Sequence, residues 1–413
     1  MNSALTVAAI QYEALDGGVP ANVLEHARLI EDAHSRGARL VVFPELSLTG
    51  YVGGSCAIGE SCGLSGAWGP DGRVLTQLDV RGPCSHFAEF DDNHAGPILP
   101  TRGRQGNVFH MSDSRANVPA LGTLLTAMVT PFTKDGEVDY KQAAELAVKL
   151  VDDGCDGLVV TGTTGETSTL TDEENLGMFR AVKEAVGGRA AIIAGTGTND
   201  TAHSVHLSQE AAKLGVDGLL IVTPYYNKPS QAGVRAHFET IASATELPVM
   251  LYDIPGRSSI QIAPETMIGL ASHPNIVAVK DAKADFAAAT RVMAETDLLF
   301  YSGDDGLTLQ WMAMGAVGLI GVTTHVVTRR FRELIDAINA NDLGTARKIN
   351  FELEPVVRAT MTRVQGAVAA KQILKWQGVL PNSVVRLPLV EPDAAEIAII
   401  REDLAEAGMD FTV

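Results

Sequence analysis

DYKQAAELAVKLVDDGCDGLVVTGTTGE (Asp139–Glu166) holds one complete copy of the pattern that decides the fold. Its first part places Ala143, Leu146 and Leu150 on one face at helical spacing, which predicts a helix. Gly154 follows as a helix-ending residue, and the apolar run Gly157–Thr161 then predicts a short buried strand. A polar loop comes directly after that strand, so the stretch reads as helix, strand and loop in succession.

The same alternation continues through most of the chain from about residue 122. Helical segments separate short apolar runs, and helices are predicted to end at Gly187 and Gly215 as well. The predicted strands are Leu124–Val129, Gly157–Thr161, Ala190–Gly195, Gly218–Thr223, Pro248–Tyr252, Ile276–Lys280, Leu298–Ser302 and Val317–Gly321.

Eight continuous apolar strands alternating with helices predict an α/β fold with a parallel sheet covered on both faces. Eight units over roughly 200 residues favour a closed (β/α)₈ TIM barrel, which we place at 117–340. An open doubly wound sheet is the alternative, but no GxGxxG sequence follows the first strand. Three further helical stretches predict a C-terminal helical region over 341–413.

The residues before the barrel form a small irregular α/β segment in this interpretation. Residues 1–80 contain two predicted strands, LTVAAIQYEA and ARLVVFPELSLTGY, with a helix predicted between them over 22–37. Residues 81–116 are rich in Gly, Ser and Asp, and we expect a disordered linker there.

Composition excludes several classes of function. The net charge is −18 over 413 residues, so the basic footprint of a nucleic-acid-binding protein is missing. No apolar run approaches the roughly 20 residues that span a membrane, and the N-terminus lacks the basic start of a signal peptide. The four cysteines show no metal-ligand spacing, so we expect a cytoplasmic chain with free thiols and no metal site.

Reactive groups of a (β/α)₈ barrel stand where its strands end at their carboxyl side. The stretch NIVAVKDAK (Asn275–Lys283) places Lys280 at such an end, directly after a buried apolar run. Burial disfavours an ammonium and lowers its pKa from about 10.4, which leaves a neutral amine able to form a Schiff base with a ketone. The alternative is a non-catalytic lysine whose side chain extends from the strand end towards water. Asp281 and Lys283 are predicted to be ordinary polar loop residues.

Other strand ends supply partners for that chemistry. Tyr252 ends the strand before that of Lys280, and the hydroxyls of Thr163 and Tyr226 extend it into a proton relay. Arg257, after Ile-Pro-Gly, suits a carboxylate. Each motif alone is equally consistent with a tight turn, aromatic packing or a surface ion pair, whereas the combination favours function.

Taken together, these motifs resemble the dihydrodipicolinate synthase family, within the pyruvate-dependent aldolase superfamily that includes N-acetylneuraminate lyase. The resemblance covers about residues 117–413. It rests on GTTGETSTLTDEE, GTGTNDTAHSV, VTPYYNKPSQAGVRAHF, LYDIPGRS, NIVAVKDAK and YSGDDGLTLQWMAMGAVGLIGV.

The resemblance implies a role for each matching residue. Lys280 would carry the pyruvate Schiff base, with Tyr252, Thr163 and Tyr226 as the proton relay and Tyr226 supplied across a dimer interface. The remaining implied substrate contacts are Thr164 for the pyruvate carboxylate, Ile320 and Gly303 around the pyruvate pocket, and Arg257 for L-aspartate 4-semialdehyde. It also implies a homotetramer, a dimer of dimers, that needs no metal or organic cofactor.

Two features depart from that family. Its lysine-inhibited members carry histidines in the region that reads Thr171, Asp172 and Asn175 here, and a glutamate at the position of His203. A base in place of that carboxylate makes feedback by lysine doubtful. Residues 1–80 instead resemble an incomplete nitrilase-superfamily segment, in which Glu45 matches the general base. The nucleophile's motif is absent, since Cys56 and Cys62 stand outside it, and Met111 is a candidate natural start of the synthase.

The predicted function is therefore the condensation of pyruvate with aspartate semialdehyde, in lysine and diaminopimelate biosynthesis. The alternative enzyme is a related lyase or aldolase that acts on a 2-keto-3-deoxy sugar acid. Arg257 favours the first, because the sugar-acid lyases lack an arginine at this point of the motif. A silent barrel that serves as a scaffold is a third interpretation, which the presence of both Lys280 and Tyr252 disfavours.

Overall fold

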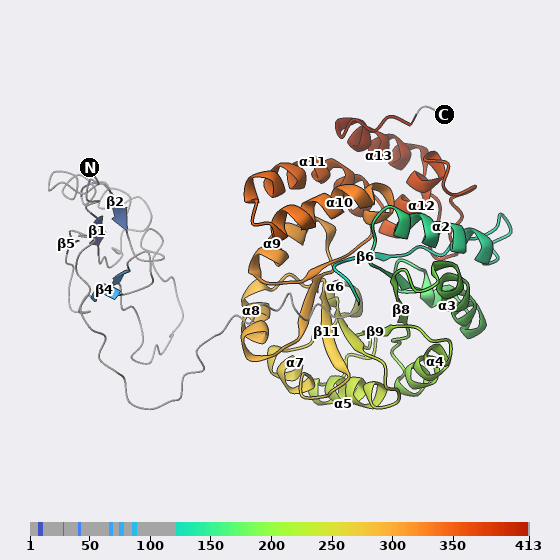
Figure 1. Cartoon of the computed structure of the whole chain (residues 1–413), viewed down its shortest axis with the longest axis horizontal. Coiled ribbons are helices and arrows are strands. Elements are labelled where there is room, and N and C mark those ends of the chain that lie inside the picture. Colours follow the sequence, from blue (N-terminus) through green and yellow to red (C-terminus); the bar gives the residue numbers. More distant parts are fainter. Residues whose placement is uncertain are drawn as a thin grey trace. The chain divides into compact units, whose positions relative to one another are not determined.

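The computed structural model describes residues 121–411, together with Arg28 and five short strands among the first hundred residues. The chain divides into two compact units, Met1–Val108 and Phe109–Val413. Figure 1 draws both units.

The first unit contains two small sheets. Strand β1 (Val7–Ile10) pairs in parallel with β2 (Leu40–Val42) and antiparallel with β5 (Ser85–Ala88). Strands β3 (Gly66–Trp68) and β4 (Val74–Gln77) form an antiparallel pair. Glu45, Cys56, Cys62 and Met111 lie outside the described residues. The predicted helix over 22–37 also lies outside them, except for Arg28.

Strand β5 falls inside the range 81–116, which was predicted to be a linker. That prediction is wrong for these four residues, because Ser85–Ala88 obtains its hydrogen-bonding partner from β1, far away in the sequence. A local pattern of Gly, Ser and Asp does not reveal such a partner. The rest of the range lies outside the described residues.

The second unit is a closed barrel of eight parallel strands in the order β6 to β13, which confirms the predicted fold (Figure 1). Every predicted strand is present, with ends that shift by at most a few residues. The strands are β6 (Leu124–Ala127), β7 (Gly157–Val160), β8 (Ala191–Gly195), β9 (Gly218–Val222), β10 (Val249–Asp253), β11 (Ile276–Asp281), β12 (Leu299–Ser302) and β13 (Gly318–Gly321).

Helices surround the barrel and bury their apolar faces against it. In α2 (Tyr140–Asp152) the buried residues include Ala143, Leu146 and Leu150, which is the face predicted from the sequence. The other helices around the strands are α3 (Asp172–Val186), α4 (Thr201–Lys213), α5 (Gln231–Ala242), α6 (Pro255–Ser258), α7 (Pro264–Leu270), α8 (Phe286–Glu295), α9 (Thr308–Met314) and α10 (Thr324–Asn339). Burying each such leucine contributes about 1.5–3 kcal/mol to folding.

Barrel closure depends on one glycine. Strand β13 pairs with β6 to close the ring, and a Cβ at Gly318 would lie 1.8 Å from the carbonyl oxygen of Thr123. No other residue fits without moving the two strands apart.

The three predicted C-terminal helices are confirmed as α11 (Leu343–Met361), α12 (Gly366–Trp376) and α13 (Ala394–Glu406). They pack on α10 around a small apolar core that includes Val356, Ile373 and Leu404. In Figure 1 they lie together beside α10 and α2, on one side of the barrel. The C-terminal region is thus part of the barrel unit, and its residues Lys371 and Arg386 contact Glu166 in the turn after β7.

Candidate active site

Lys280 and Tyr252 lie side by side where β11 and β10 end. The two residues are in register on neighbouring parallel strands, and the Lys280 Nζ atom is 4.5 Å from the centre of the Tyr252 ring. Lys280 is only 4% exposed, and its amine donates no hydrogen bond to any residue that the structure describes. An ammonium without a hydrogen-bonding partner is unfavourable in such a place.

Burial accordingly lowers the pKa of Lys280 to about 8. Within this net change of the pKa, the carboxylate of Asp305 acts to raise it and the positive charge of Arg257 acts to lower it. Asp305 is itself buried and accepts hydrogen bonds from the backbone N–H groups of Val322 and Thr323, at 3.0 and 2.7 Å. The site therefore favours a neutral amine over the ammonium of an exposed lysine.

This pKa gives a test of the Schiff base that the sequence leads us to expect on Lys280. If Lys280 is that residue, the rate of adduct formation with pyruvate should rise with pH and level off above about 8, because only the neutral amine attacks the ketone. Initial rates can be measured between about pH 6 and pH 10, with every sample quenched into borohydride at one fixed pH. A rate that continues to rise towards the pKa of an ordinary lysine would contradict the assigned environment.

Tyr252 keeps its proton in this site. The residue is 5% exposed, and burial raises the pKa of its phenol to about 12. The charge of Arg257 and the hydroxyl of Thr163, which is within hydrogen-bonding reach, partly offset this rise. A neutral phenol both donates and accepts a hydrogen bond, so Tyr252 can pass a proton to or from a group on Lys280.

The end of β7 and the turn that follows it place Thr161 and Thr164 at the site. A Cβ at Gly165 would lie 2.7 Å from the Thr161 Cα atom, so only glycine allows the chain to fold back here. Thr164 is 8% exposed, and Thr161 is fully buried with a hydroxyl that lacks a hydrogen-bonding partner in the described structure. The turn is thus closely packed, with hydroxyl groups available to a ligand.

The C-terminal region holds this turn in place. The Glu166 carboxylate accepts a hydrogen bond from Lys371 Nζ at 2.5 Å and another from the Arg386 backbone N–H at 2.9 Å. Lys371 is 1% exposed and also donates to the carbonyl of Val384 at 2.9 Å. Helix α12 and the segment after it therefore position the turn that carries Thr163.

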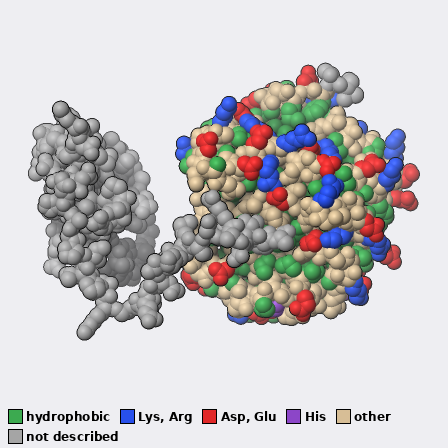
Figure 2. Space-filling model, viewed as in Figure 1, with side chains coloured by type: hydrophobic (Ala, Val, Ile, Leu, Met, Phe, Trp, Pro, Cys, Tyr) green, Lys and Arg blue, Asp and Glu red, His purple; other side chains and the backbone are tan. Residues whose placement is uncertain are grey.

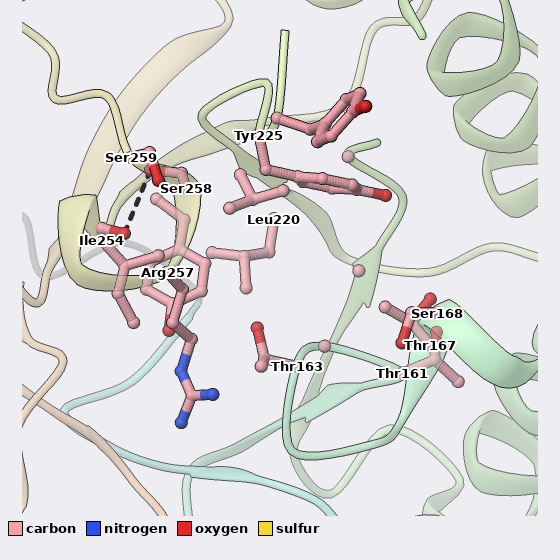
Figure 3. A pocket seen from close by; sticks show the side chains of 16 residues that line it. Thr161, Thr163, Thr167, Ser168, Leu220, Tyr225, Ile254, Arg257, Ser258 and Ser259 are labelled. Carbon is pink, nitrogen blue, oxygen red and sulfur yellow. Dashed lines mark hydrogen bonds between the residues drawn. The ribbon is translucent and has the colours of Figure 1, made fainter. Parts of the chain in front are cut away.

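A cavity of about 350 Å³ opens at these strand ends. Figure 3 shows Thr161, Thr167 and Ser168 on one side of it and Ile254, Arg257 and Ser259 on the other. Its lining residues are Thr161, Gly162, Thr163, Thr167, Ser168, Gly195, Gly197, Leu220, Val222, Tyr225, Tyr226, Tyr252, Ile254, Arg257, Ser258 and Ser259.

The cavity brings together four of the predicted site residues, namely Thr163, Tyr226, Tyr252 and Arg257. Tyr226 is 88% exposed, with a left-handed backbone (φ 70°). Arg257 is also exposed and forms no ion pair with any described residue, so a surface ion pair does not account for it. A free guanidinium at a cavity wall is suited to an anionic ligand.

The other four predicted residues do not line this cavity. Lys280 and Thr164 are buried beside it. Ile320 is fully buried in β13, and Gly303 follows β12, where its N–H donates to the carbonyl of Asp281 at 2.7 Å. A Cβ at Gly303 would lie 2.9 Å from that oxygen, so the close approach of the two backbones requires glycine.

Lys283 is not the ordinary loop residue that the sequence suggested. Its side chain is 10% exposed, and its Nζ atom is 2.9 Å from the fully buried carboxylate of Asp253. Asp281 is also buried and accepts hydrogen bonds from the N–H groups of Lys283 and Ala284. Burial raises the pKa of Asp253 to about 6, although Lys283 opposes the rise. Sequence reasoning missed this pair because Asp253 ends β10, whereas Lys283 lies 30 residues later in the turn after β11.

The residues that depart from the lysine-inhibited pattern also lie together. His203 Nε2 is 2.8 Å from Asp172 Oδ1, and both side chains are partly exposed. Asn175 is buried and donates to the carbonyl of Thr171 at 3.0 Å. These side chains are therefore engaged with neighbours within the chain.

The described residues offer no group of three or more His, Cys, Asp or Glu side chains that could hold a metal ion. Within the same residues, no helix has the length and apolar character needed to cross a membrane. On the face drawn in Figure 2, basic and acidic side chains are interspersed over the barrel.

A buried lysine of lowered pKa, beside a tyrosine at the mouth of a (β/α)₈ barrel, defines a class I aldolase-type enzyme. Comparison with known proteins identifies the family within this class of enzymes. The family model described as Dihydrodipicolinate synthetase family matches residues 120–407, and the chain belongs to this family.

Relatives agree over the same region. A 4-hydroxy-tetrahydrodipicolinate synthase of Mycobacterium leprae is 53% identical over 294 residues, which cover 71% of this chain and 97% of the relative. A crystal structure of a dihydrodipicolinate synthase from Bacillus anthracis has 40% identity and a TM-score of 0.67, covering 69% of this chain and 98% of that one. A structure described as a monomeric dihydrodipicolinate synthase variant has 32% identity and a TM-score of 0.67, covering 70% of this chain and 97% of that one.

The N-terminal resemblance also has a counterpart. Residues 6–62 match the family model for carbon-nitrogen hydrolases. This match covers a small part of the chain and lies within the range 1–80 predicted to resemble nitrilases.

Proposed function

We propose that this chain condenses pyruvate with L-aspartate 4-semialdehyde through a Schiff base on Lys280. The product is 4-hydroxy-tetrahydrodipicolinate, a precursor for lysine and diaminopimelate biosynthesis. The observation that carries the proposal is the buried Lys280 amine of lowered pKa beside the Tyr252 phenol, in a chain of the dihydrodipicolinate synthetase family.

The reaction begins with attack of the neutral Lys280 amine on the keto carbon of pyruvate. Tyr252 donates a proton to the departing oxygen, which leaves as water, and an iminium forms. The iminium withdraws electrons, so the methyl carbon loses a proton and becomes an enamine nucleophile. That carbon attacks the aldehyde carbon of aspartate semialdehyde, and the aldehyde oxygen takes up a proton to become the 4-hydroxyl group.

Ring closure releases the enzyme. The amino group of the bound aspartate semialdehyde attacks the carbon that is attached to Lys280, and the lysine departs as the new carbon–nitrogen bond forms. The overall reaction loses one water. Thr163 and the partner subunit's Tyr226 carry protons between Tyr252 and solvent, and no metal or organic cofactor takes part in this sequence.

The substrates' carboxylates need separate holders. We assign the pyruvate carboxylate to Thr164 and its turn, with the Ile320 carbonyl and Gly303 bordering the pyruvate. Arg257 binds the carboxylate of aspartate semialdehyde, which its unpaired guanidinium and its place at the cavity wall support.

Tyr226 also supports an assembled enzyme. A tyrosine that is 88% exposed in one copy leaves a large apolar ring in water. We assign Tyr226 to the site of a second copy, within a homotetramer built as a dimer of dimers. Native mass spectrometry tests this assembly, and a Tyr226→Arg variant should shift the population towards smaller species.

The second substrate is tested by presenting both aldehydes to the enzyme. Turnover with aspartate semialdehyde, and none with a sugar aldehyde as acceptor or with a 2-keto-3-deoxy sugar acid as lyase substrate, is the expected result. The reverse preference would contradict the proposed function.

Replacing Arg257 with methionine should weaken binding of the aldehyde and leave pyruvate binding intact. Loss of a charge-assisted contact of about 3 kcal/mol corresponds to a KM for aspartate semialdehyde raised by roughly 100-fold. The pKa of Lys280 should also rise, because a neighbouring positive charge is removed. Steady-state kinetics with each substrate varied in turn gives the two KM values.

Equal increases in both KM values would contradict the role assigned to Arg257. Arg235→Met provides a matched control, since Arg235 is an exposed arginine on α5 that pairs with Glu239 at 2.7 Å. This control should leave both KM values unchanged.

A further inference from the structure

The loop that carries Arg257 is closed at its base. The loop runs from Asp253, at the end of β10, to Ile262, and both ends are fully buried. The Ile262 N–H donates to Asp253 Oδ1 at 3.2 Å, which joins the two ends directly. Arg257 lies midway along this loop, in the short helix α6.

Lys283 contacts the same base from the turn that follows the neighbouring strand β11. Its Nζ atom donates to Asp253 Oδ2 at 2.9 Å and to the carbonyl of Ile262 at 3.3 Å. One ammonium therefore contacts both ends of the Arg257 loop. Burial keeps this pair out of water, so its geometry is more restricted than that of an exposed ion pair.

The position of Lys283 is itself fixed relative to Lys280. Asp281 directly follows Lys280, and its carboxylate accepts hydrogen bonds from the Lys283 and Ala284 N–H groups at 2.8 and 2.9 Å. Ala284 adopts a left-handed conformation (φ 61°), which completes a tight turn. The turn directs Lys283 from the Lys280 strand towards the base of the Arg257 loop.

Arg257 lacks an ion-pair partner among the described residues, so its own side chain does not hold it in place. Its position depends on the backbone of the loop. Within the loop, the Ser258 hydroxyl donates to the carbonyl of Ile254 at 3.0 Å (Figure 3). It also donates to the carbonyl of Ile260 at 2.7 Å. The only ion pair made by any residue from Asp253 to Ile262, within the described part of the chain, is the one between Asp253 and Lys283.

We propose that Lys283 and Asp253 are positioning residues that set the distance between Arg257 and the Lys280 amine, and thereby select the second substrate. The ion pair between Lys283 and Asp253 links the loop of Arg257, which holds the aldehyde's carboxylate, to strand β11, which carries Lys280 and the enamine. This inference rests on the proposed function, and it adds a role for two residues that touch neither substrate. Displacing Arg257 by about 1 Å is enough to cost a large factor in rate.

The test separates binding of the two substrates in a Lys283→Met variant. The KM for aspartate semialdehyde should rise about tenfold, the effect of a loss of about 1.4 kcal/mol. The KM for pyruvate and the yield of the borohydride-trapped Lys280 adduct should stay within about twofold of wild type. Lys283→Arg, which can still reach both oxygens, should recover most of the aldehyde KM.

Two further variants keep the test decisive. Lys183→Met is the matched control, because Lys183 pairs with Asp217 at 2.8 Å just before β9, at the opposite end of the barrel. It should change neither KM. If Lys283→Met does not fold, the double variant Asp253→Asn/Lys283→Met can be used, because it leaves no unpaired buried charge. It should show the same selective rise in the KM for aspartate semialdehyde.

An unchanged aldehyde KM in these variants would overturn the inference, as would a parallel loss of pyruvate trapping. Failure of the wild-type enzyme to form the pyruvate adduct would instead contradict the proposed function. The two failures are therefore distinguishable.

Discussion

Replacing Lys280 with methionine should abolish catalysis and at the same time stabilise the fold. Removing a covalent nucleophile lowers kcat by about 10⁴-fold or more. The stability of the protein should rise, because the buried ammonium is no longer taken out of water. Activity assays and thermal unfolding of the same preparations measure both effects.

The size of the stabilisation follows from the pKa of Lys280. Its folded-state pKa is about 8, below the 10.5 of an unfolded chain, so the unfolded state binds more protons between these values. The penalty is therefore fully present below about pH 8 and disappears as the pH rises towards 10.5. At neutral pH the methionine variant should gain on the order of 3 kcal/mol, and less at higher pH.

The control for this prediction is Lys141→Met. Lys141 is an exposed lysine whose side chain is 88% accessible, and it should alter neither activity nor stability appreciably. A Lys280→Met protein that melts earlier than wild type, or that retains a substantial part of the wild-type rate, would contradict the environment and role given to Lys280.

Replacing Tyr252 with phenylalanine should have the second largest effect. The variant keeps the aromatic ring beside Lys280 and removes only the phenolic hydroxyl. Loss of a positioned proton donor costs about 10²–10⁴-fold in rate. Single-turnover measurements of adduct formation with pyruvate, followed by addition of the aldehyde, show which proton transfers are slowed.

Tyr301 offers a matched control for Tyr252. It lies in register with Lys280 on the other neighbouring strand, and its hydroxyl donates to the carbonyl of Gly122 at 2.8 Å. Tyr301→Phe should cost about 1 kcal/mol of stability through that lost hydrogen bond, with little effect on rate. Equal losses of activity in the two variants would remove the special role of Tyr252.

Much of this fold was predictable from sequence because its signals are local. Each barrel strand is a short apolar run that is followed by a polar loop, and each helix carries one apolar face. Lys280 could be found in this way, because its strand ends at a charge. The pairing of β5 with β1 could not, since its partner is far away along the chain.

The parts of the site that escaped prediction depend on contacts between distant segments. Glu166 and Lys371 are 205 residues apart, and only the folded chain brings them together. Lys283 reads as a loop residue until the turn made by Asp281 aims it at Asp253. A residue's type and neighbours indicate whether it can react, whereas the fold decides what it touches.

The central claim is that Lys280 forms a Schiff base with pyruvate, and one measurement tests it most directly. The full chain is incubated with pyruvate, reduced with borohydride, digested and mapped by mass spectrometry. A single reduced pyruvate adduct on the peptide that contains Lys280, absent without pyruvate and absent in Lys280→Met, is the predicted result. A protein that turns over both substrates but carries no adduct, or carries it on another lysine, would contradict the account.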